Sequence, residues 1–147
     1  MNIASQKLVG IVSVVMALSQ SSALGADQSP AEVLAPKEGM LLEGIDHVCR
    51  GRLNGTANGK LWPVVLIRPL VAGQPYYVQQ PVGAVTNGTF FAPVNVGDDN
   101  TPPGTKFVFV VVLAKDRQAA QAFEPDSKFQ TLPDLPQSDP VIVTRSK

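Results

Sequence analysis

The sequence has few of the residues on which most catalytic, metal and nucleic-acid sites depend. It holds one cysteine and one histidine in 147 residues, and its 12 basic residues balance 12 acidic ones. One cysteine excludes an internal disulfide and a zinc site built on several thiolates. Balanced charge without a Lys/Arg cluster argues against binding to nucleic acid and against a polybasic membrane anchor. With 44% hydrophobic residues, the chain is expected to fold as one domain around an apolar core.

Long hydrophobic runs are also absent, apart from one near the N-terminus. Leu8–Leu18 is an apolar stretch that follows Lys7 and precedes small and polar residues, among them Ala23 and Gly25. This three-part pattern is typical of a secretory signal peptide, and the stretch is about half the ~20 residues that a membrane-spanning helix needs. We therefore predict a signal peptide over residues 1–25, a secreted or periplasmic protein, and no membrane insertion after cleavage. An uncleaved short anchor is the alternative.

A single thiol in an exported protein favours a bacterial envelope over a eukaryotic secretory route, in which small domains tend to be stapled by disulfides. Asn54-Gly55-Thr56 and Asn87-Gly88-Thr89 would accept glycans only in a eukaryote. We interpret both Asn-Gly pairs as turns, because Gly tolerates a positive φ and Asn nearly does.

Short β-prone runs alternate with Gly, Asn and Pro after a lead-in over residues 26–38 that we expect to be flexible. The predicted strands are Met40–Glu43, His47–Leu53, Leu61–Arg68, Tyr76–Gln80, Thr89–Val96 and Lys106–Lys115. Pro63 cannot donate to a ladder hydrogen bond, which favours an edge strand or a bulge at that position. Only Arg117–Phe123 has a helical pattern. These features predict a β-sandwich domain over residues 39–123.

The run Phe107–Leu113 is apolar on both faces, whereas a strand with one solvated face would alternate apolar and polar residues. Either the segment from Phe123 to the C-terminus or a partner protein must cover the second face. Residues 124–147 hold four prolines and are predicted to form an extended Pro-rich arm. Val141–Thr144, near its end, is either a final edge strand or part of a frayed tail.

Four stretches, GKLWPVVLIRP, PYYVQQPVGAV, NGTFFAPVNVG and GTKFVFVVVLA, resemble a family of small bacterial exported immunoglobulin-like domains. The matching positions are Gly59, Trp62, Tyr77, Gln79, Pro81, Gly88, Phe90, Gly97, Gly104 and Phe107. The resemblance runs from Asp46 to Lys115 and a little beyond. It implies an all-β, immunoglobulin-like β-sandwich of about seven short antiparallel strands. It implies no catalytic residue, because its motifs mark the fold.

Two sets of polar residues are candidates for chemistry. His47 and Cys49 share one face of a strand, as a nucleophile–base pair or a weak metal site would require, although such neighbours seldom reach each other without a bend. A metal would need further ligands, such as Met40 or Asp46. The alternative is a buried thiol beside a surface histidine. The Asp98-Asp99-Asn100 run lacks the ligand spacing of a calcium loop, so we interpret it as a solvated turn.

Tyr76 and Tyr77 point to opposite faces of their strand, so we expect one of them to pack inward and the other to be exposed. With Gln79 they form a candidate patch for a sugar or a peptide. Stacking on sugars usually recruits more than one aromatic side chain, and the chain holds few. Trp62 is expected in the core.

These observations favour a non-catalytic, exported protein-interaction module without a cofactor, whose partner is another envelope or extracellular protein. Strand addition at a sheet edge would suit such a domain. One alternative is a β-sandwich that binds a carbohydrate or another small ligand at Tyr76, Tyr77 and Gln79. The other is a metal or thiol site at His47 and Cys49.

Overall fold

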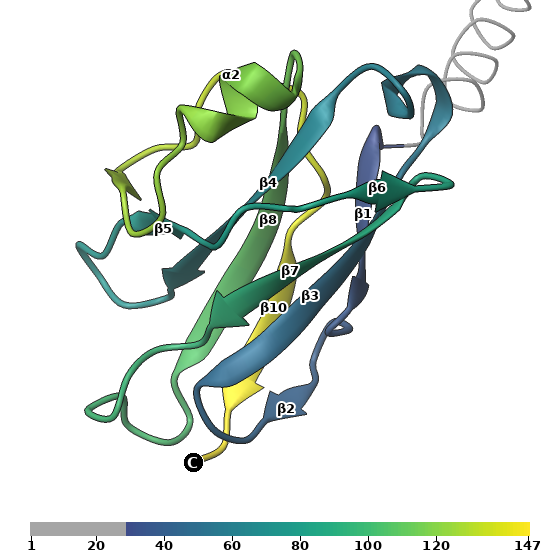
Figure 1. Cartoon of the computed structure of the whole chain (residues 1–147). Helices are drawn as coiled ribbons and strands as arrows, with labels where there is room; N and C mark the ends of the chain where they lie inside the picture. The colour runs from purple at the N-terminus through teal and green to yellow at the C-terminus, as the bar shows by residue number, and fades with distance from the viewer. Residues whose placement is uncertain (1–28) are drawn as a thin grey trace, which may run out of the picture.

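The computed structural model describes residues 29–147, so the predicted signal peptide lies outside the described part of the chain. Two β-sheets pack face to face, with a short helix at one end (Figure 1). The strands are β1 (Ala31–Ala35), β2 (Leu41–Leu42), β3 (Asp46–Leu53), β4 (Trp62–Pro69), β5 (Tyr76–Val78), β6 (Val85–Thr86), β7 (Thr89–Asn95), β8 (Lys106–Ala114), β9 (Lys128–Phe129) and β10 (Val141–Arg145). The helix is α2 (Arg117–Gln121), and η1 (Gly55–Ala57) is a 3-10 turn. Within residues 29–147, no helix is long and apolar enough to cross a membrane.

Sheet A has four strands in the order β1-β3-β7-β6, and sheet B has six in the order β2-β10-β8-β4-β5-β9. Neighbouring strands are antiparallel except β2 and β10, which pair in parallel. The pair β3–β7 forms the centre of sheet A, and β4–β8 forms the centre of sheet B. The predicted β-sandwich is therefore confirmed.

The core lies between the two sheets because alternate residues of the central strands point inward. On β3, Cys49, Gly51 and Leu53 are buried, whereas the residues between them are exposed. Most of the largest fully buried side chains of this inner core come from β4, β7 and β8: Val65, Ile67, Phe90, Phe109, Val111 and Leu113. Alternation on β3 and β7 thus leaves the outer face of sheet A to solvent.

The second apolar face of β8 is covered by residues 115–140, which we call the covering segment. Phe123, Phe129, Leu132 and Leu135 of this segment pack on the outward side chains of β4 and β8. Backbone pairing fixes the segment as well: the Leu113 N–H donates to the Pro136 carbonyl, and the Val111 N–H donates to the Ser138 hydroxyl, each at 2.9 Å. The sequence left two possibilities for covering this face, the C-terminal part of the chain or a partner protein, and in the structure the chain's own segment covers it.

The structure differs from the sequence-based expectation at both ends of the predicted domain. Residues 31–35, expected to be flexible, form β1, because Ala31 and Val33 bury their side chains in the inner core while the strand pairs with β3. At the other end, β9 and β10 lie beyond residue 123. Val141–Thr144 belongs to β10, which lies between β8 and β2 and is therefore not an edge strand. The sandwich extends beyond both of the predicted limits, 39 and 123.

Candidate functional site

His47 and Cys49 lie on the same face of β3, as predicted, but their side chains have different surroundings. The His47 Nε2–H donates to the Gly44 carbonyl at 3.1 Å. Cys49 is fully buried opposite Ala92 of β7. Asp46, considered as a metal ligand, is exposed and alternates with His47 along the strand. Within residues 29–147, no three His, Cys, Asp or Glu side chains come together as a metal site would require.

Burial also determines the chemistry of the Cys49 thiol. Desolvation raises its pKa from 9.0 to about 12, because the apolar core disfavours the thiolate. The nucleophilic form of a cysteine is the thiolate. At neutral pH the folded protein therefore presents a neutral, inert thiol at this position.

We predict that the Cys49 thiol reacts with a disulfide reagent about a thousandfold more slowly at pH 8 in the folded protein than in the unfolded chain, because three pKa units separate the two thiols. The raised pKa also stabilises the folded state below pH 9, and this contribution is lost as the pH rises from about 9 to 12. Timed thiol titration in buffer and in denaturant measures the difference. Equal rates in the two conditions would show that Cys49 is not buried.

The two tyrosines lie on opposite faces of β5, as their alternation predicts. Tyr76 faces the covering segment, with the Arg68 guanidinium 5.4 Å from its ring centre and Phe129 as its strand partner. Tyr77 lies on the other face and lines a pocket that also includes Gln79. The structure therefore brings Tyr77 and Gln79 together and places Tyr76 elsewhere.

The Gln79 amide joins the two sheets. Its Nε2 group donates to the Tyr77 carbonyl at 3.0 Å, and its Oε1 accepts the Asn95 N–H of β7 at 2.8 Å. Gln79 is 9% exposed. Because these bonds occupy its amide on both sides, Gln79 positions the pocket wall and has little left to offer a ligand.

The pocket opens at one end of the sandwich and has a volume of about 470 Å³. It is formed by the end of β4, the β4–β5 hairpin, β5, the β7–β8 loop, the start of β8 and the turn before β9. Its lining residues are Ile67, Pro69, Val71, Gln74, Tyr77, Gln79, Asn95, Gly97, Asp98, Asn100, Thr101, Pro102, Thr105, Phe107 and Asp126. Sequence reasoning missed most of this set, since the segments are far apart in the chain and no local motif marks them.

The predicted turn at Asp98 forms one wall of this pocket. The Asp98 carboxylate accepts the Asn100 N–H at 2.8 Å and lies 3.3 Å from the Thr101 hydroxyl. Buried Arg145 donates from one guanidinium nitrogen to the carbonyls of Val96 and Asp98, each at 3.0 Å. The loop is thus held from within by its own side chains and by β10.

The outer face of sheet A exposes apolar side chains that no segment within residues 29–147 covers. Phe91 on β7 is 57% exposed and Val48 on β3 is 56% exposed. Strand register places Val48 opposite Pro93 and Arg50 opposite Phe91, and all four point outward. We call these four residues the open face. Sequence alternation could have indicated it, because Val48, Phe91 and Pro93 stand at outward positions of strands with a buried side.

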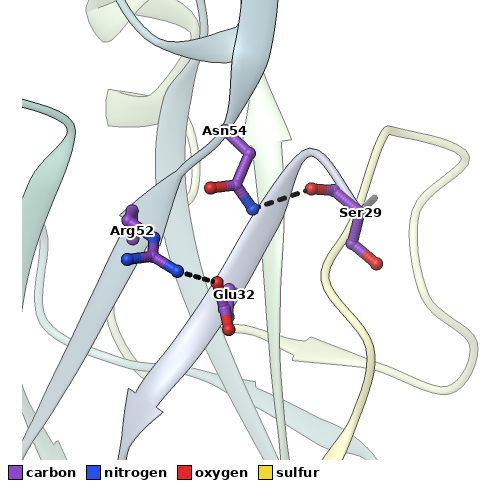
Figure 2. A network of polar contacts seen from close by, with 4 residues as sticks. All are labelled: Ser29, Glu32, Arg52 and Asn54. Carbon is purple, nitrogen blue, oxygen red and sulfur yellow. Dashed lines mark hydrogen bonds and ion pairs between the residues drawn. The ribbon is translucent and has the colours of Figure 1, made fainter. Parts of the chain in front are cut away.

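A polar network borders the open face on the β1 side (Figure 2). The Arg52 guanidinium pairs with the Glu32 carboxylate at 2.6 Å, and the Asn54 amide donates to the Ser29 carbonyl at 3.0 Å. The Arg52–Glu32 contact is the one ion pair among residues 29–147. Arg50, in the middle of the open face, therefore has no carboxylate partner within the described chain.

No family model and no curated protein matches this sequence. What is established is a mainly β domain of two packed sheets, with an open face on sheet A and a pocket of mixed polarity at one end.

Proposed function

We propose that this protein is a non-catalytic interaction module, exported from the cell, that binds another envelope or extracellular protein through the open face of sheet A. The proposal rests on one observation: the chain covers the outer face of sheet B but leaves apolar side chains exposed on the outer face of sheet A. Apolar residues on the outer face of sheet B lie under the covering segment, whereas Phe91 and Val48 on sheet A are more than half exposed. Exposed apolar patches on sheets are typical of sites of protein association.

We also propose that the sandwich is immunoglobulin-like. In variable-type immunoglobulin domains one sheet holds strands A, B, E and D, and the other holds G, F, C and C′. The order β1-β3-β7-β6 corresponds to the first sheet, and β10-β8-β4-β5 corresponds to the second. Trp62 on β4 occupies the strand that carries the buried tryptophan of those domains. These matches support the resemblance that the sequence motifs suggest.

The chemistry of the open face indicates what kind of partner surface it fits. Aromatic residues, phenylalanine among them, and arginine are enriched in protein interfaces relative to the rest of the surface. Because Arg50 has no ion pair within the described chain, a partner that sets a carboxylate next to apolar side chains would pair with Arg50 and bury Phe91. We therefore expect a protein partner with a mixed acidic and apolar contact surface.

A photo-crosslinking amino acid at position 91 tests this proposal in the cells that make the protein. We expect a light-dependent adduct to a second protein when p-benzoylphenylalanine replaces Phe91. The matched control replaces exposed Gln118 on α2, which lies on the covering segment. Adducts at neither position, or equally at both, would contradict a contact surface on sheet A. Thermal melting of both variants establishes that they fold.

A second function is favoured by the pocket at the end of the sandwich. Tyr77 lines it together with amide, hydroxyl and carboxylate groups and several apolar side chains, as in a small-ligand site. Binding of a carbohydrate or another small molecule there is the alternative function, and it requires neither Phe91 nor Arg50.

A further inference from the structure

One end of the outer face of sheet B carries exposed apolar side chains that the covering segment does not bury. α2 lies at the opposite end of the sandwich from β2 and the C-terminus (Figure 1). At the end with β2, Leu41 is 67% exposed, and Leu70, just after β4, is 42% exposed. Lys106, the first residue of β8, is also exposed. These three side chains are therefore available to a partner.

Strand register places these residues in one row across sheet B. Leu41 is the partner of Thr144 on β10, and Thr144 is the partner of Lys106. The Leu70 N–H donates to the Lys106 carbonyl at 2.8 Å. The following residue on β2 and on β8 and the preceding residue on β10 belong to the inner core, and the residue after Leu70 lines the end pocket, so the row points outward. With neighbouring strands about 4.8 Å apart, the row is roughly 14 Å long.

Arg68 lies next to this row and has a donor without an acceptor. It is the strand partner of Val108, so it lies diagonally across from Lys106 on the same face, at about 7–8 Å. Its guanidinium lies over the Tyr76 ring, 5.4 Å from the ring centre. Within residues 29–147, the Arg68 Nε is the one buried side-chain nitrogen or oxygen atom without a hydrogen-bond partner. Such a donor destabilises the free protein, and a ligand that accepts from it removes that cost.

The charges of Arg68 and Lys106 are not compensated by the described chain. Neither residue forms an ion pair, since the one ion pair within residues 29–147 lies on sheet A. Glu38, which precedes β2, accepts the Ile142 N–H through its carboxylate at 2.9 Å. Two like charges on neighbouring strands repel each other, so a carboxylate between them would stabilise both. Arginine binds a carboxylate best through two parallel N–H groups, and Nε with one Nη atom forms such a pair.

We propose that Arg68, Lys106, Leu41 and Leu70, which we call the basic patch, bind an extended acidic segment of a partner protein. Side chains on one face of an extended strand repeat about every 6.8 Å, so an apolar, an acidic and an apolar residue at positions i, i+2 and i+4 span about 14 Å, the length of the row. The two apolar side chains pack on Leu41 and Leu70. The carboxylate binds between Lys106 and Arg68, whose guanidinium turns from the Tyr76 ring toward the row.

The charges of the patch favour this occupant over two others. An anionic membrane surface requires a cluster of about four or more cations, and the patch has two. The open face of a second copy would bring Arg50 toward Arg68 and Lys106, which is not complementary. The basic patch lies on the opposite sheet from the open face, so the proposal goes beyond the function of that face and does not depend on it.

The test titrates the full chain with the peptide acetyl-Leu-Thr-Glu-Thr-Leu-amide and follows backbone amide shifts by nuclear magnetic resonance. The control peptide has glutamine in place of glutamate. We expect saturable shifts at Leu70 and Val108, with an affinity for the acidic peptide at least about fivefold above that for the control. Equal affinities would overturn the proposal, as would shifts at these residues with phosphatidylglycerol vesicles but not with the peptide. Shifts there that depend on protein concentration alone would identify a second copy as the occupant and overturn it too.

Two substitutions of Arg68 tie the expected binding to its guanidinium. Arg68→Leu removes the unpartnered Nε and keeps an apolar side chain over Tyr76, so it is expected to fold with at least the stability of the parent. It should bind the acidic peptide no more tightly than the control peptide. Arg68→Lys keeps the charge without the paired N–H groups, so its affinity should be intermediate. An unchanged affinity in Arg68→Leu would overturn the proposal.

The matched control variant is Arg117→Leu. The Arg117 guanidinium also lies over an aromatic ring, 5.0 Å from the centre of Trp62, but at the α2 end of the sandwich. This variant should keep the affinity of the parent for the acidic peptide. Phe91→Ser should also leave the shifts at Leu70 and Val108 unchanged, so failure of the basic patch and failure of the open face are distinguishable.

Discussion

Replacing Gly51 by alanine is expected to destabilise the protein by about 3 kcal/mol, or to prevent folding, because the added methyl group has no space. Gly51 lies on the inward face of β3, opposite Phe90 of β7. A Cβ atom at residue 51 would meet the Phe90 ring, with Cζ at 2.2 Å and two further ring carbons at 2.7 and 2.8 Å. The ring is fully buried, and the close packing of a core leaves little space for it to move aside. Urea unfolding followed by tryptophan fluorescence measures the loss.

Two companion variants separate this clash from a general effect of losing a glycine. Gly83→Ala adds a methyl group in open space at a backbone without a positive φ, so it should be neutral or stabilise by up to about 1 kcal/mol. Phe90→Leu shortens the ring that Gly51 faces, so Gly51→Ala should cost less in that background than alone. A full cost for Gly51→Ala in both backgrounds would show that Phe90 is not the obstacle.

The second large effect is expected from the covering segment. Serine at both Phe123 and Phe129 should destabilise the protein by roughly 3 kcal/mol, since two partly buried rings are lost from the outer face of sheet B. The two rings also contact each other, with centres 5.7 Å apart. Their loss exposes the outward valines of β8, so the variant should also bind a hydrophobic dye and self-associate at high concentration.

The control for this variant lies in the same segment. Gln118 and Gln130 are exposed, so serine at both positions shortens two side chains of the segment without removing an apolar contact with sheet B. This variant should have the melting temperature of the parent and the same elution volume in size-exclusion chromatography. If the phenylalanine variant behaved like this control, sheet B would not depend on the covering segment for its cover, and the contrast between the two outer faces would be lost.

The sequence predicts the central strands well, because each combines β-prone residues with turn residues at its ends. The strand predicted over Leu61–Arg68 is β4. Its pairing with β5 is limited to Leu66 and Ile67, so at Pro63 this side of β4 has no strand partner, as expected for a proline in a strand. β1 was missed because Pro30 and Pro36 flank it and its pairing with β3 is a long-range event. Residues 124–140 of the covering segment have no regular period, and only the full fold brings their apolar side chains to sheet B.

The candidate sites were less accessible to sequence reasoning. The alternation of Tyr76 and Tyr77 was sufficient to place them on opposite faces, but Asp126 and Asn95 reach the same pocket only through the packing of distant segments. The bond from the Asn95 N–H to Gln79, which turns a candidate ligand-binding amide into a structural one, depends on the approach of β5 to β7. The binding role of Tyr77 stays a prediction.

Hydroxyl-radical footprinting of the six phenylalanines, without and with an extract of the cell envelope, tests most directly whether the open face is the contact surface. In the isolated protein, Phe91 should be oxidised fastest, because Phe90, Phe107 and Phe109 are buried and the covering segment is packed on sheet B. With extract, the rate at Phe91 should fall while the rates at Phe123 and Phe129 stay the same. Slow oxidation of Phe91 in the isolated protein, or an unchanged rate in the extract, would contradict the account.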